Sequence, residues 1–278
     1  MLDASVPCQP GIWVTNPTHN IACNTLTYVF APLGLPAHLE TLCDALRLFV
    51  LTGAGISAES GLGTFRDQGG LWERFDPMKL ATPEAFAHDP QAVYAFYNAR
   101  RRNLLAAEPN AAHEALARLE AGLAARGDEL ILVTQNIDDL HERAGSRRVI
   151  HMHGELLKAR CVACQAIIGW REDLGNDASC TACHEPGTMR PHVVWFGEMP
   201  LHMEAIEAAL VTSDLFVAIG TSGSVYPAAG FVAQARDQGV RTCELNLEPS
   251  DNADMFDTRR YGPASTTVKA WVDEILAR

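Results

Sequence analysis

Four short runs of apolar residues recur along the chain, separated by much longer mixed segments. The runs cover residues 48–51, 130–133, 215–219 and 243–247. Consecutive apolar positions are typical of the central strands of a parallel sheet, which are buried on both faces. Each run leads into small or polar residues that core packing does not require. Because the carboxyl ends of parallel strands form the ligand crevice of an open sheet, this pattern predicts a nucleotide-like ligand there.

Helical patterns lie between the predicted strands. They cover residues 111–126, 201–211 and 228–238. This alternation favours an α/β fold, a Rossmann-like parallel sheet with helices on both faces. Two further segments, one helical and one containing cysteines, fall outside the alternation and predict a smaller lobe over the strand ends.

The predicted domain organisation follows from these segments, with one catalytic domain over residues 41–278. Its Rossmann lobe is expected to comprise about 41–76, 110–153 and 192–278. Its smaller lobe is expected to comprise a helical part at about 77–109 and a zinc-binding part at about 154–191. Residues 1–40 are expected to be a poorly ordered extension. A signal or transit peptide requires early Arg or Lys residues, and the first of either here is Arg47.

Composition and charge argue against two classes of partner. No apolar run reaches the roughly 18 residues that a membrane-spanning helix needs, so we expect no contact with a membrane. A formal net charge of -12 argues against direct nucleic-acid binding, because phosphates require basic patches. The acidity suits a basic partner, such as a lysine-rich protein segment, or simply keeps the protein soluble.

Two Cys-x-x-Cys pairs, Cys161/Cys164 and Cys180/Cys183, give the strongest single signal. Fifteen residues separate the pairs, a spacing typical of a four-thiolate zinc site. Four thiolates leave no open coordination position, so the predicted zinc is structural. His184 is the alternative ligand. The other cysteines follow no pattern, and without an export signal we expect reduced thiols and a cytoplasmic location.

Three weaker motifs have two interpretations each on spacing alone. The loop Gly53-Ala54-Gly55 either lets backbone N–H groups approach a pyrophosphate or forms a plain tight turn. Either His151 or His153 suits a general base, and spacing does not choose between them. Tyr97 and Arg100 share a helix face and predict either carboxylate recognition or a solvated basic surface.

Taken together, these motifs resemble the sirtuin family of NAD-dependent protein-lysine deacylases. The resemblance spans about residues 48–264 and rests on GAGIS, TFR, TQNID, HGE, the cysteine quartet, GTS and NLEPS. Segments 81–83, 96–100 and 190–198 are similar to the bacterial CobB-type and mitochondrial desuccinylase branch. The chain departs from that branch at Gly63, where a larger residue is common, so we expect a looser loop over the cofactor.

The resemblance implies that NAD is a co-substrate. The residues it assigns to NAD are Gly53, Ala54, Gly55, Ser57, Phe65, Arg66, Gln135, Asn136, Ile137, Asp138, Gly220, Thr221, Ser222, Asn246, Leu247, Glu248 and Ala264. Phe65 would cover the nicotinamide, and Asn136 would also take part in catalysis. His153, directly before Gly154, would be the general base.

The resemblance also implies a second set of residues, for a protein substrate with an acylated lysine. These are Ala81, Tyr97, Arg100, Trp195, Phe196, Gly197 and Glu198. Tyr97 and Arg100 match the pair that binds an acidic acyl tail, and Ala81 matches the small residue that makes room for it. The peptide would lie as an extended strand between residues 195–198 and 223–224.

The implied reaction is deacetylation, with desuccinylase or demalonylase activity, by acyl transfer to ADP-ribose and release of nicotinamide. An ADP-ribosyltransferase or NAD glycohydrolase using the same site is the alternative, and it would consume NAD without an acyl-peptide. A dehydrogenase should carry G-x-G-x-x-G, whereas Ala58 stands in place of the third glycine. A nucleotide-binding zinc scaffold would release no nicotinamide.

Overall fold

A six-stranded parallel sheet forms the centre of the fold. The computed structural model describes residues 45–63 and 77–278. The strand order is β3-β2-β1-β7-β8-β9, and every neighbouring pair is parallel. The strands are β1 (Arg47–Thr52), β2 (Glu129–Thr134), β3 (Val149–His151), β7 (Leu215–Ile219), β8 (Arg241–Asn246) and β9 (Thr258–Tyr261). This arrangement confirms the predicted fold class.

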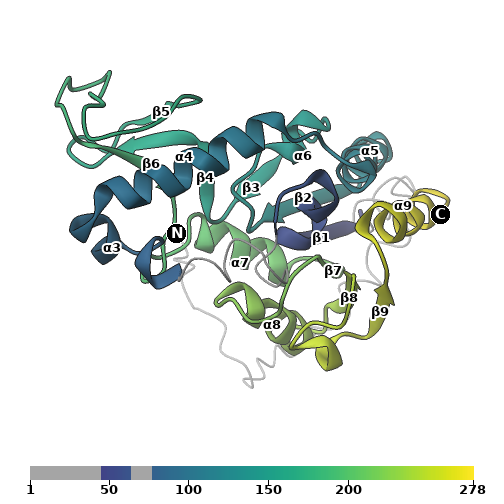
Figure 1. The fold of residues 1–278 in the computed structure, drawn as a ribbon. Coiled ribbons are helices and arrows are strands. Elements are labelled where there is room, and N and C mark those ends of the chain that lie inside the picture. Colours follow the sequence, from purple (N-terminus) through teal and green to yellow (C-terminus); the bar gives the residue numbers. More distant parts are fainter. Residues whose placement is uncertain (1–44, 64–76) are drawn as a thin grey trace, which may run out of the picture. The chain divides into compact units, whose positions relative to one another are not determined.

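Helices cover both faces of the sheet because the central strands carry apolar residues on both faces. Leu48 and Val50 of β1 pack into one hydrophobic cluster, and Phe49 and Leu51 pack into another on the opposite face. The first cluster includes α5 and α9, and the second includes α7 and α8. Figure 1 shows these two pairs of helices on opposite sides of the sheet. The four helices are α5 (Ala111–Ala125), α7 (Met203–Val211), α8 (Phe231–Asp237) and α9 (Ala264–Leu276).

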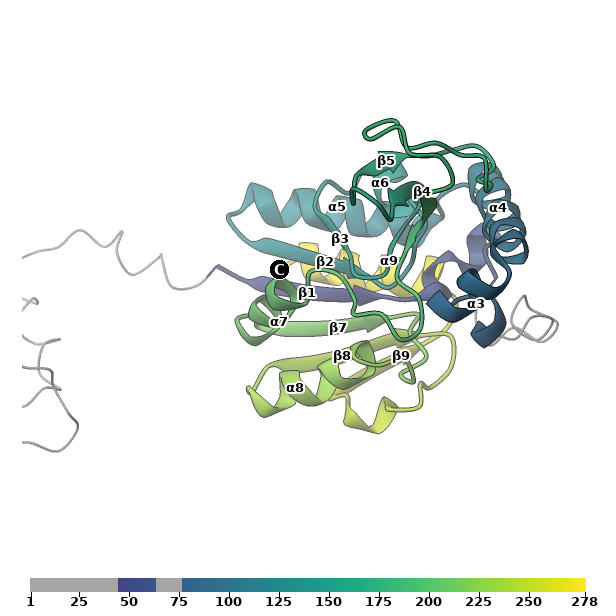
Figure 2. The ribbon, with the colours of Figure 1, turned by 90° about the vertical axis from the view of Figure 1, so that its left-hand side faces the viewer.

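A three-stranded antiparallel sheet and two helices form a second group of elements. The sheet has the order β5-β4-β6. Its strands are β4 (Gly154–Cys161), β5 (Ile167–Gly169) and β6 (Met189–Val193), and the helices are α3 (Pro83–His88) and α4 (Pro90–Ala106). Figure 2 shows α3 and α4 beside the ends of the large sheet's strands.

Short elements complete the described chain. They are η3 (Ala54–Ser60), η4 (Pro77–Lys79), α6 (Leu140–Arg143), η5 (Ala228–Gly230) and η6 (Ala253–Met255). The helix predicted from residue 201 begins at Met203, because the left-handed backbone of His202 (φ 61°) precludes an earlier start. No described helix is both long and apolar enough to cross a membrane. The predicted extension 1–40 and the predicted NAD residues Phe65 and Arg66 lie outside the described residues.

Candidate active site and metal centre

A cleft of about 1610 Å³ opens where β1, β2, β7 and β8 end. A single small ligand usually occupies roughly 300–1,000 Å³, so the cleft has room for two substrates. The predicted NAD residues on its walls are Gly53, Ala54, Gly55, Ser57, Gln135, Asn136, Ile137, Asp138, Gly220, Thr221, Ser222, Asn246, Leu247, Glu248 and Ala264. The predicted general base, His153, and the predicted substrate-binding residues also line it: Ala81, Tyr97, Arg100, Trp195, Phe196, Gly197 and Glu198. The fold thus brings every described site residue except the cysteines to one cleft.

Two glycine loops pack against each other to form the floor of this cleft. Gly55 N donates to Gly220 O at 2.9 Å. A Cβ atom on Gly55 would lie 2.7 Å from Gly220 Cα, and one on Gly220, whose φ is 62°, would lie 2.5 Å from Ile56 N. Only glycine fits such a close backbone approach. The two loops therefore present a surface of main chain, which suits the approach of phosphate groups.

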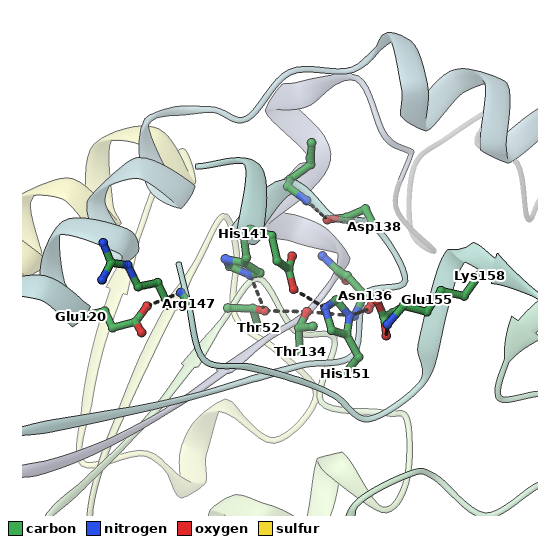
Figure 3. A network of polar contacts seen from close by, with 12 residues as sticks. Thr52, Glu120, Thr134, Asn136, Asp138, His141, Arg147, His151, Glu155 and Lys158 are labelled. Atoms are coloured by element: carbon green, nitrogen blue, oxygen red, sulfur yellow. Dashed lines mark hydrogen bonds and ion pairs between the residues drawn. The ribbon is translucent and has the colours of Figure 1, made fainter. Parts of the chain in front are cut away.

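A buried chain of hydrogen bonds holds Asn136 at the end of β2 (Figure 3). His141 Nε2 lies 3.0 Å from Thr52 Oγ1, and Thr52 Oγ1 donates to Thr134 Oγ1 at 2.9 Å. Thr134 Oγ1 in turn accepts the Asn136 backbone N–H at 3.0 Å. The Asn136 side-chain amide donates to Gly53 O at 3.1 Å. These bonds connect the ends of β1 and β2 and fix the orientation of Asn136.

Ser57 and Asp138 extend this network toward the cleft. Ser57 Oγ accepts from the Asn136 side-chain amide at 3.1 Å and donates to Asp138 Oδ2 at 3.0 Å. Burial raises the pKa of Asp138, although its bonds from the Leu140 N–H and from Ser57 oppose that rise. Asp138 is thus an acceptor held in place within a largely desolvated part of the site.

His153 lies on the cleft wall with one ring nitrogen already engaged. Its Nδ1 lies 2.9 Å from Gln135 O. A carbonyl oxygen only accepts, so Nδ1 carries the proton and Nε2 of the neutral ring has a free lone pair. Burial lowers the pKa of His153, which keeps the ring neutral near pH 7, and the Gln135 bond offsets only part of this. The geometry therefore suits a general base.

His151 has a different environment, although it lies only two residues away. Its Nε2 forms an ion pair with Glu142 Oε1 at 2.6 Å, and its Nδ1 lies 3.4 Å from Asn136 O. Burial lowers the pKa of His151, but the Glu142 bond and charge, with Glu155, outweigh burial and raise it. Both nitrogens of His151 are engaged and its charged form is favoured, so the geometry favours His153 over His151 as a base.

The four cysteines of the two Cys-x-x-Cys pairs lie together, Cys161 at the end of β4 and the other three in loops of the smaller sheet. All four Sγ atoms lie within 4.8 Å of one another. Cys161 Sγ is 3.7 Å from Cys183 Sγ, and Cys164 Sγ is 3.7 Å from Cys180 Sγ. A tetrahedral zinc site with Zn–S bonds of about 2.3 Å has edges of about 3.8 Å. A disulfide would need about 2.05 Å.

The thiol pKa values also fit a bound cation. Hydrogen bonds with Thr188 and the Cys164 N–H lower the pKa of Cys161 to about 6. At Cys183 the Glu185 N–H acts in the same direction, but desolvation and the neighbouring thiols outweigh it and raise the pKa to about 12. Four thiols this close resist joint ionisation unless a divalent cation lies between them. The quartet is a structural zinc site.

Tyr97, Arg100 and Trp195 all line the cleft, and Tyr97 contacts both of the others. Tyr97 is 1% exposed, and its oxygen accepts a hydrogen bond from Trp195 Nε1 at 2.9 Å. Arg100 Cζ lies 6.0 Å from the Tyr97 ring centroid. Burial lowers the pKa of Arg100, while Tyr97 and Asp138 act in the opposite direction. Ala81 is buried beside them, and its carbonyl accepts the Phe196 N–H at 2.9 Å.

A family model described as the Sir2 family matches residues 53–227. The chain belongs to the Sir2 family. It is 63% identical over 233 residues to an NAD-dependent protein deacylase of Caulobacter vibrioides, covering 84% of this chain and 98% of that one. It is 56% identical over 232 residues to an NAD-dependent protein deacylase of Escherichia coli K12, covering 83% and 82%. These findings confirm the predicted family.

Solved Sir2 structures share the fold. A Sir2 homologue in complex with NAD has a TM-score of 0.73 at 37% identity, covering 86% of this chain and 92% of that one. A mutant Sir2 homologue in complex with 2′-O-acetyl ADP-ribose has a TM-score of 0.75 at 36% identity, covering 87% and 96%. The cleft of this Sir2 chain therefore belongs to a fold that binds NAD in a relative.

Two residues that the sequence pattern did not reveal, Asn110 and Arg190, support the site without lining the cleft. Asn110 caps α5, and its side chain also donates to Ile56 O at 2.8 Å and so anchors the glycine loop. Pro-Asn before an alanine-rich helix is an N-cap signal that could have revealed it. Arg190 binds the Glu198 carboxylate with both Nη atoms, at 2.7 and 3.0 Å. No local signal distinguishes Arg190 from a solvated arginine.

Proposed function

We propose that this Sir2 protein is an NAD-dependent protein-lysine deacylase. It removes acyl groups from lysine side chains of proteins, transfers them to ADP-ribose and releases nicotinamide. The observation that carries this proposal is the neutral ring of His153 on the cleft wall, whose Nδ1–H is held by Gln135 O just after β2. The names of the relatives, NAD-dependent protein deacylases, agree with it.

The residues of the large sheet fit NAD. Main-chain groups of the two glycine loops suit the pyrophosphate, and side chains at the ends of β2 and β8 suit the riboses and bases. Bound NAD supplies the ADP-ribosyl group that receives the acyl group. Asn136 and Asp138 hold the nicotinamide end, and Thr221, Ser222, Asn246, Leu247, Glu248 and Ala264 hold the adenosine end.

His153 performs the proton transfer. Its Nε2 takes a proton from a ribose hydroxyl while Nδ1–H stays on Gln135 O, which stabilises the ring in one tautomer as the charge develops. The structural zinc stabilises the smaller sheet and supplies no reactive water, because its ligands fill all four positions.

The part of the cleft lined by Tyr97 and Arg100 favours acyl groups that carry a carboxylate. We therefore propose desuccinylase or demalonylase activity in addition to deacetylation. Arg100 offers a guanidinium fork and Tyr97 a hydroxyl to the distal carboxylate of such an acyl group. Tyr97 is buried, which strengthens its bond to the carboxylate by excluding water. Ala81, with its small side chain, leaves room for the longer acyl chain.

The substrate peptide is proposed to bind as an extended strand between residues 195–198 and 223–224. Both segments border the cleft, and Phe196 is 43% exposed there. The Glu198 carboxylate is engaged by Arg190, so the contribution of Glu198 to peptide binding comes from its main chain.

The acidic net charge suits lysine-rich protein partners and disfavours nucleic acid. Closely spaced cysteines that hold zinc and form no disulfide support a reducing, cytoplasmic location.

Nicotinamide release from NAD with three versions of one lysine peptide tests the proposal. Acetyl- and succinyl-lysine peptides should stimulate release and yield free lysine and the matching O-acyl-ADP-ribose, whereas the unmodified peptide should not. Release that is independent of any acyl-peptide would instead indicate an NAD glycohydrolase. Transfer of ADP-ribose to protein would indicate an ADP-ribosyltransferase.

A further inference from the structure

The Tyr97 hydroxyl has its hydrogen-bonding roles set by Trp195. The Trp195 indole N–H points at the Tyr97 oxygen, with 2.9 Å between the two atoms. An indole nitrogen can only donate, so the Tyr97 oxygen is the acceptor in this bond. Both side chains are almost fully buried, at 1% and 2% exposure. The Tyr97 proton must therefore point away from Trp195.

The direction left for this proton is the cleft. Within residues 45–63 and 77–278, no group accepts a hydrogen bond from the Tyr97 hydroxyl. Buried hydroxyls in proteins almost always find an acceptor, so an unfilled one in a substrate cleft indicates a ligand with an acceptor there. Arg100 lines the same part of the cleft. A hydroxyl donor and a guanidinium together match a carboxylate.

Trp195 is itself held by an ion pair between Arg190, which does not line the cleft, and Glu198 on the cleft wall. Arg190 Cζ lies 3.3 Å from the Trp195 ring centroid, stacked on its face. The Glu198 carboxylate that binds Arg190 also accepts the Trp195 backbone N–H, at 2.8 Å. Arg190 is 5% exposed, so its guanidinium is shielded from water, whereas Glu198 is partly exposed. One Arg–Glu pair therefore fixes both the main chain and the ring of Trp195.

We propose that Trp195 is a positioning residue for acyl selectivity, which keeps the Tyr97 hydroxyl proton directed into the cleft as a fixed donor. Arg190 contributes by holding the Trp195 ring in place. The inference rests on the proposed function and identifies the contact that sets its preference for acidic acyl groups. A donor already oriented loses no freedom on binding, so its bond contributes more to affinity. An acetyl group has no distal carboxylate and gains nothing from this arrangement.

A double-mutant cycle on the full chain with its zinc tests the proposal. The readout is the ratio of kcat/KM for succinyl-lysine to that for acetyl-lysine in one peptide, with kcat and KM reported separately. Trp195→Phe keeps an aromatic ring but removes the N–H, and Tyr97→Phe removes the hydroxyl. Each should lower the ratio about tenfold, mainly through KM for the succinyl peptide. The double variant should lower it no further than Tyr97→Phe alone, because Trp195 acts through that hydroxyl.

Two further variants control for general damage. Trp170→Phe removes an indole bond to Asp173 O (3.4 Å) near the zinc site, outside the cleft, and should leave the ratio unchanged. Arg190→Lys keeps a positive charge but cannot bind Glu198 as a fork, and should lower the ratio by less than Trp195→Phe. The Trp195 Nε1–H NMR signal, identified by its loss in Trp195→Phe, should shift in Tyr97→Phe. That readout does not depend on turnover.

The outcomes separate this inference from the proposed function. A wild-type enzyme that treats succinyl and acetyl peptides alike would overturn the acidic-acyl part of the proposed function, and the positioning role with it. A wild-type preference for succinyl that survives Trp195→Phe would overturn the positioning role alone. A double variant whose succinyl-to-acetyl ratio falls by the product of the two single effects would also overturn the positioning role, because Trp195 would then act independently of Tyr97.

Discussion

The rings of His151 and His153 hydrogen-bond to consecutive carbonyl oxygens of one loop, those of Asn136 and Gln135, yet their pKa values shift in opposite directions. Glu142 faces His151 and favours its charged form. Burial favours the neutral form of His153, and no carboxylate of the described residues raises the pKa of that ring. Two histidines of one short segment thus have different tasks. His151 holds the loop, and His153 is available as a base.

Replacing these histidines singly should separate the two tasks. His153→Ala should bind NAD but lose roughly 10²–10⁴-fold in kcat, the usual contribution of a positioned acid–base group. His151→Ala should lose far less, because it removes only a support of the Asn136 loop. Steady-state kinetics with NAD binding measured by calorimetry checks both. A larger loss in His151→Ala than in His153→Ala would overturn the assignment of the base.

The pH dependence of kcat/KM should reflect the lowered pKa of His153. The base works only when neutral, so the rate should stay constant near pH 7–8 and fall as the pH drops through the His153 pKa. Because burial lowers that pKa, the fall should be centred below the usual histidine value of about 6.5. An acid limb centred above that value would contradict the neutral-base assignment.

The ion pair of His151 with Glu142 should stabilise the fold in a pH-dependent way. A raised folded-state pKa means that the stabilisation is fully present below about pH 6.5 and is lost as the pH rises through the folded pKa above it. Glu142→Gln should therefore lower the melting temperature more at pH 6 than at pH 9. Glu142 is about two-fifths exposed, so the difference at pH 6 should be roughly 1 kcal/mol or less.

Nearby groups require a matched control for this measurement. Glu155 of β4 also raises the His151 pKa, and its own partner Lys158 lies 2.6 Å away. His141 of α6 stays neutral because burial lowers its pKa. Glu108→Gln removes the exposed partner of Arg143, 2.8 Å away, and should show no such pH dependence. Equal effects of Glu142→Gln at both pH values would mean that His151 is neutral in the folded protein.

The sequence predicted the central strands and the zinc quartet because each signal is local. The three residues of β3 are too few to show a pattern, and β9 carries two arginines where a buried strand would be apolar. The apolar residues of α9 follow helical spacing, so this helix was predictable from the sequence; they are Val268, Trp271, Val272 and Ile275. The weak signals of β3 and β9 explain why four strands were predicted where the described chain has six in its large sheet.

The supporting contacts of the site could not be predicted from spacing. The Trp195–Tyr97 bond joins residues 98 positions apart, and the Asn110–Ile56 bond joins residues 54 apart. Such pairs depend on how β6, α4 and the glycine loop pack, which no local pattern encodes. The choice between His151 and His153 likewise depended on a contact of His151 with Glu142, a partly exposed residue of α6.

Zinc removal should abolish activity indirectly. Met189, next to Arg190, is the register partner of Cys161 across β4 and β6, so the zinc loops and the support of Trp195 share one small sheet. Chelation should unfold this sheet, because closed thiolate sites contribute directly to folding. Elemental analysis should find one zinc per chain. Full activity after demonstrated removal would contradict the structural role.

Arg100→Met should separate acidic from neutral acyl groups. Methionine preserves much of the apolar stem but cannot pair with a carboxylate. A hydrogen bond to a charged group contributes about 1.5–3 kcal/mol, so desuccinylation should fall roughly ten- to a hundredfold in kcat/KM. Deacetylation should fall much less, because an acetyl group offers Arg100 no carboxylate. Measured on one peptide with both acyl groups, equal losses would instead show that Arg100 stabilises α4 and Tyr97 rather than the substrate, since its guanidinium also lies 5.5 Å from the Phe96 ring.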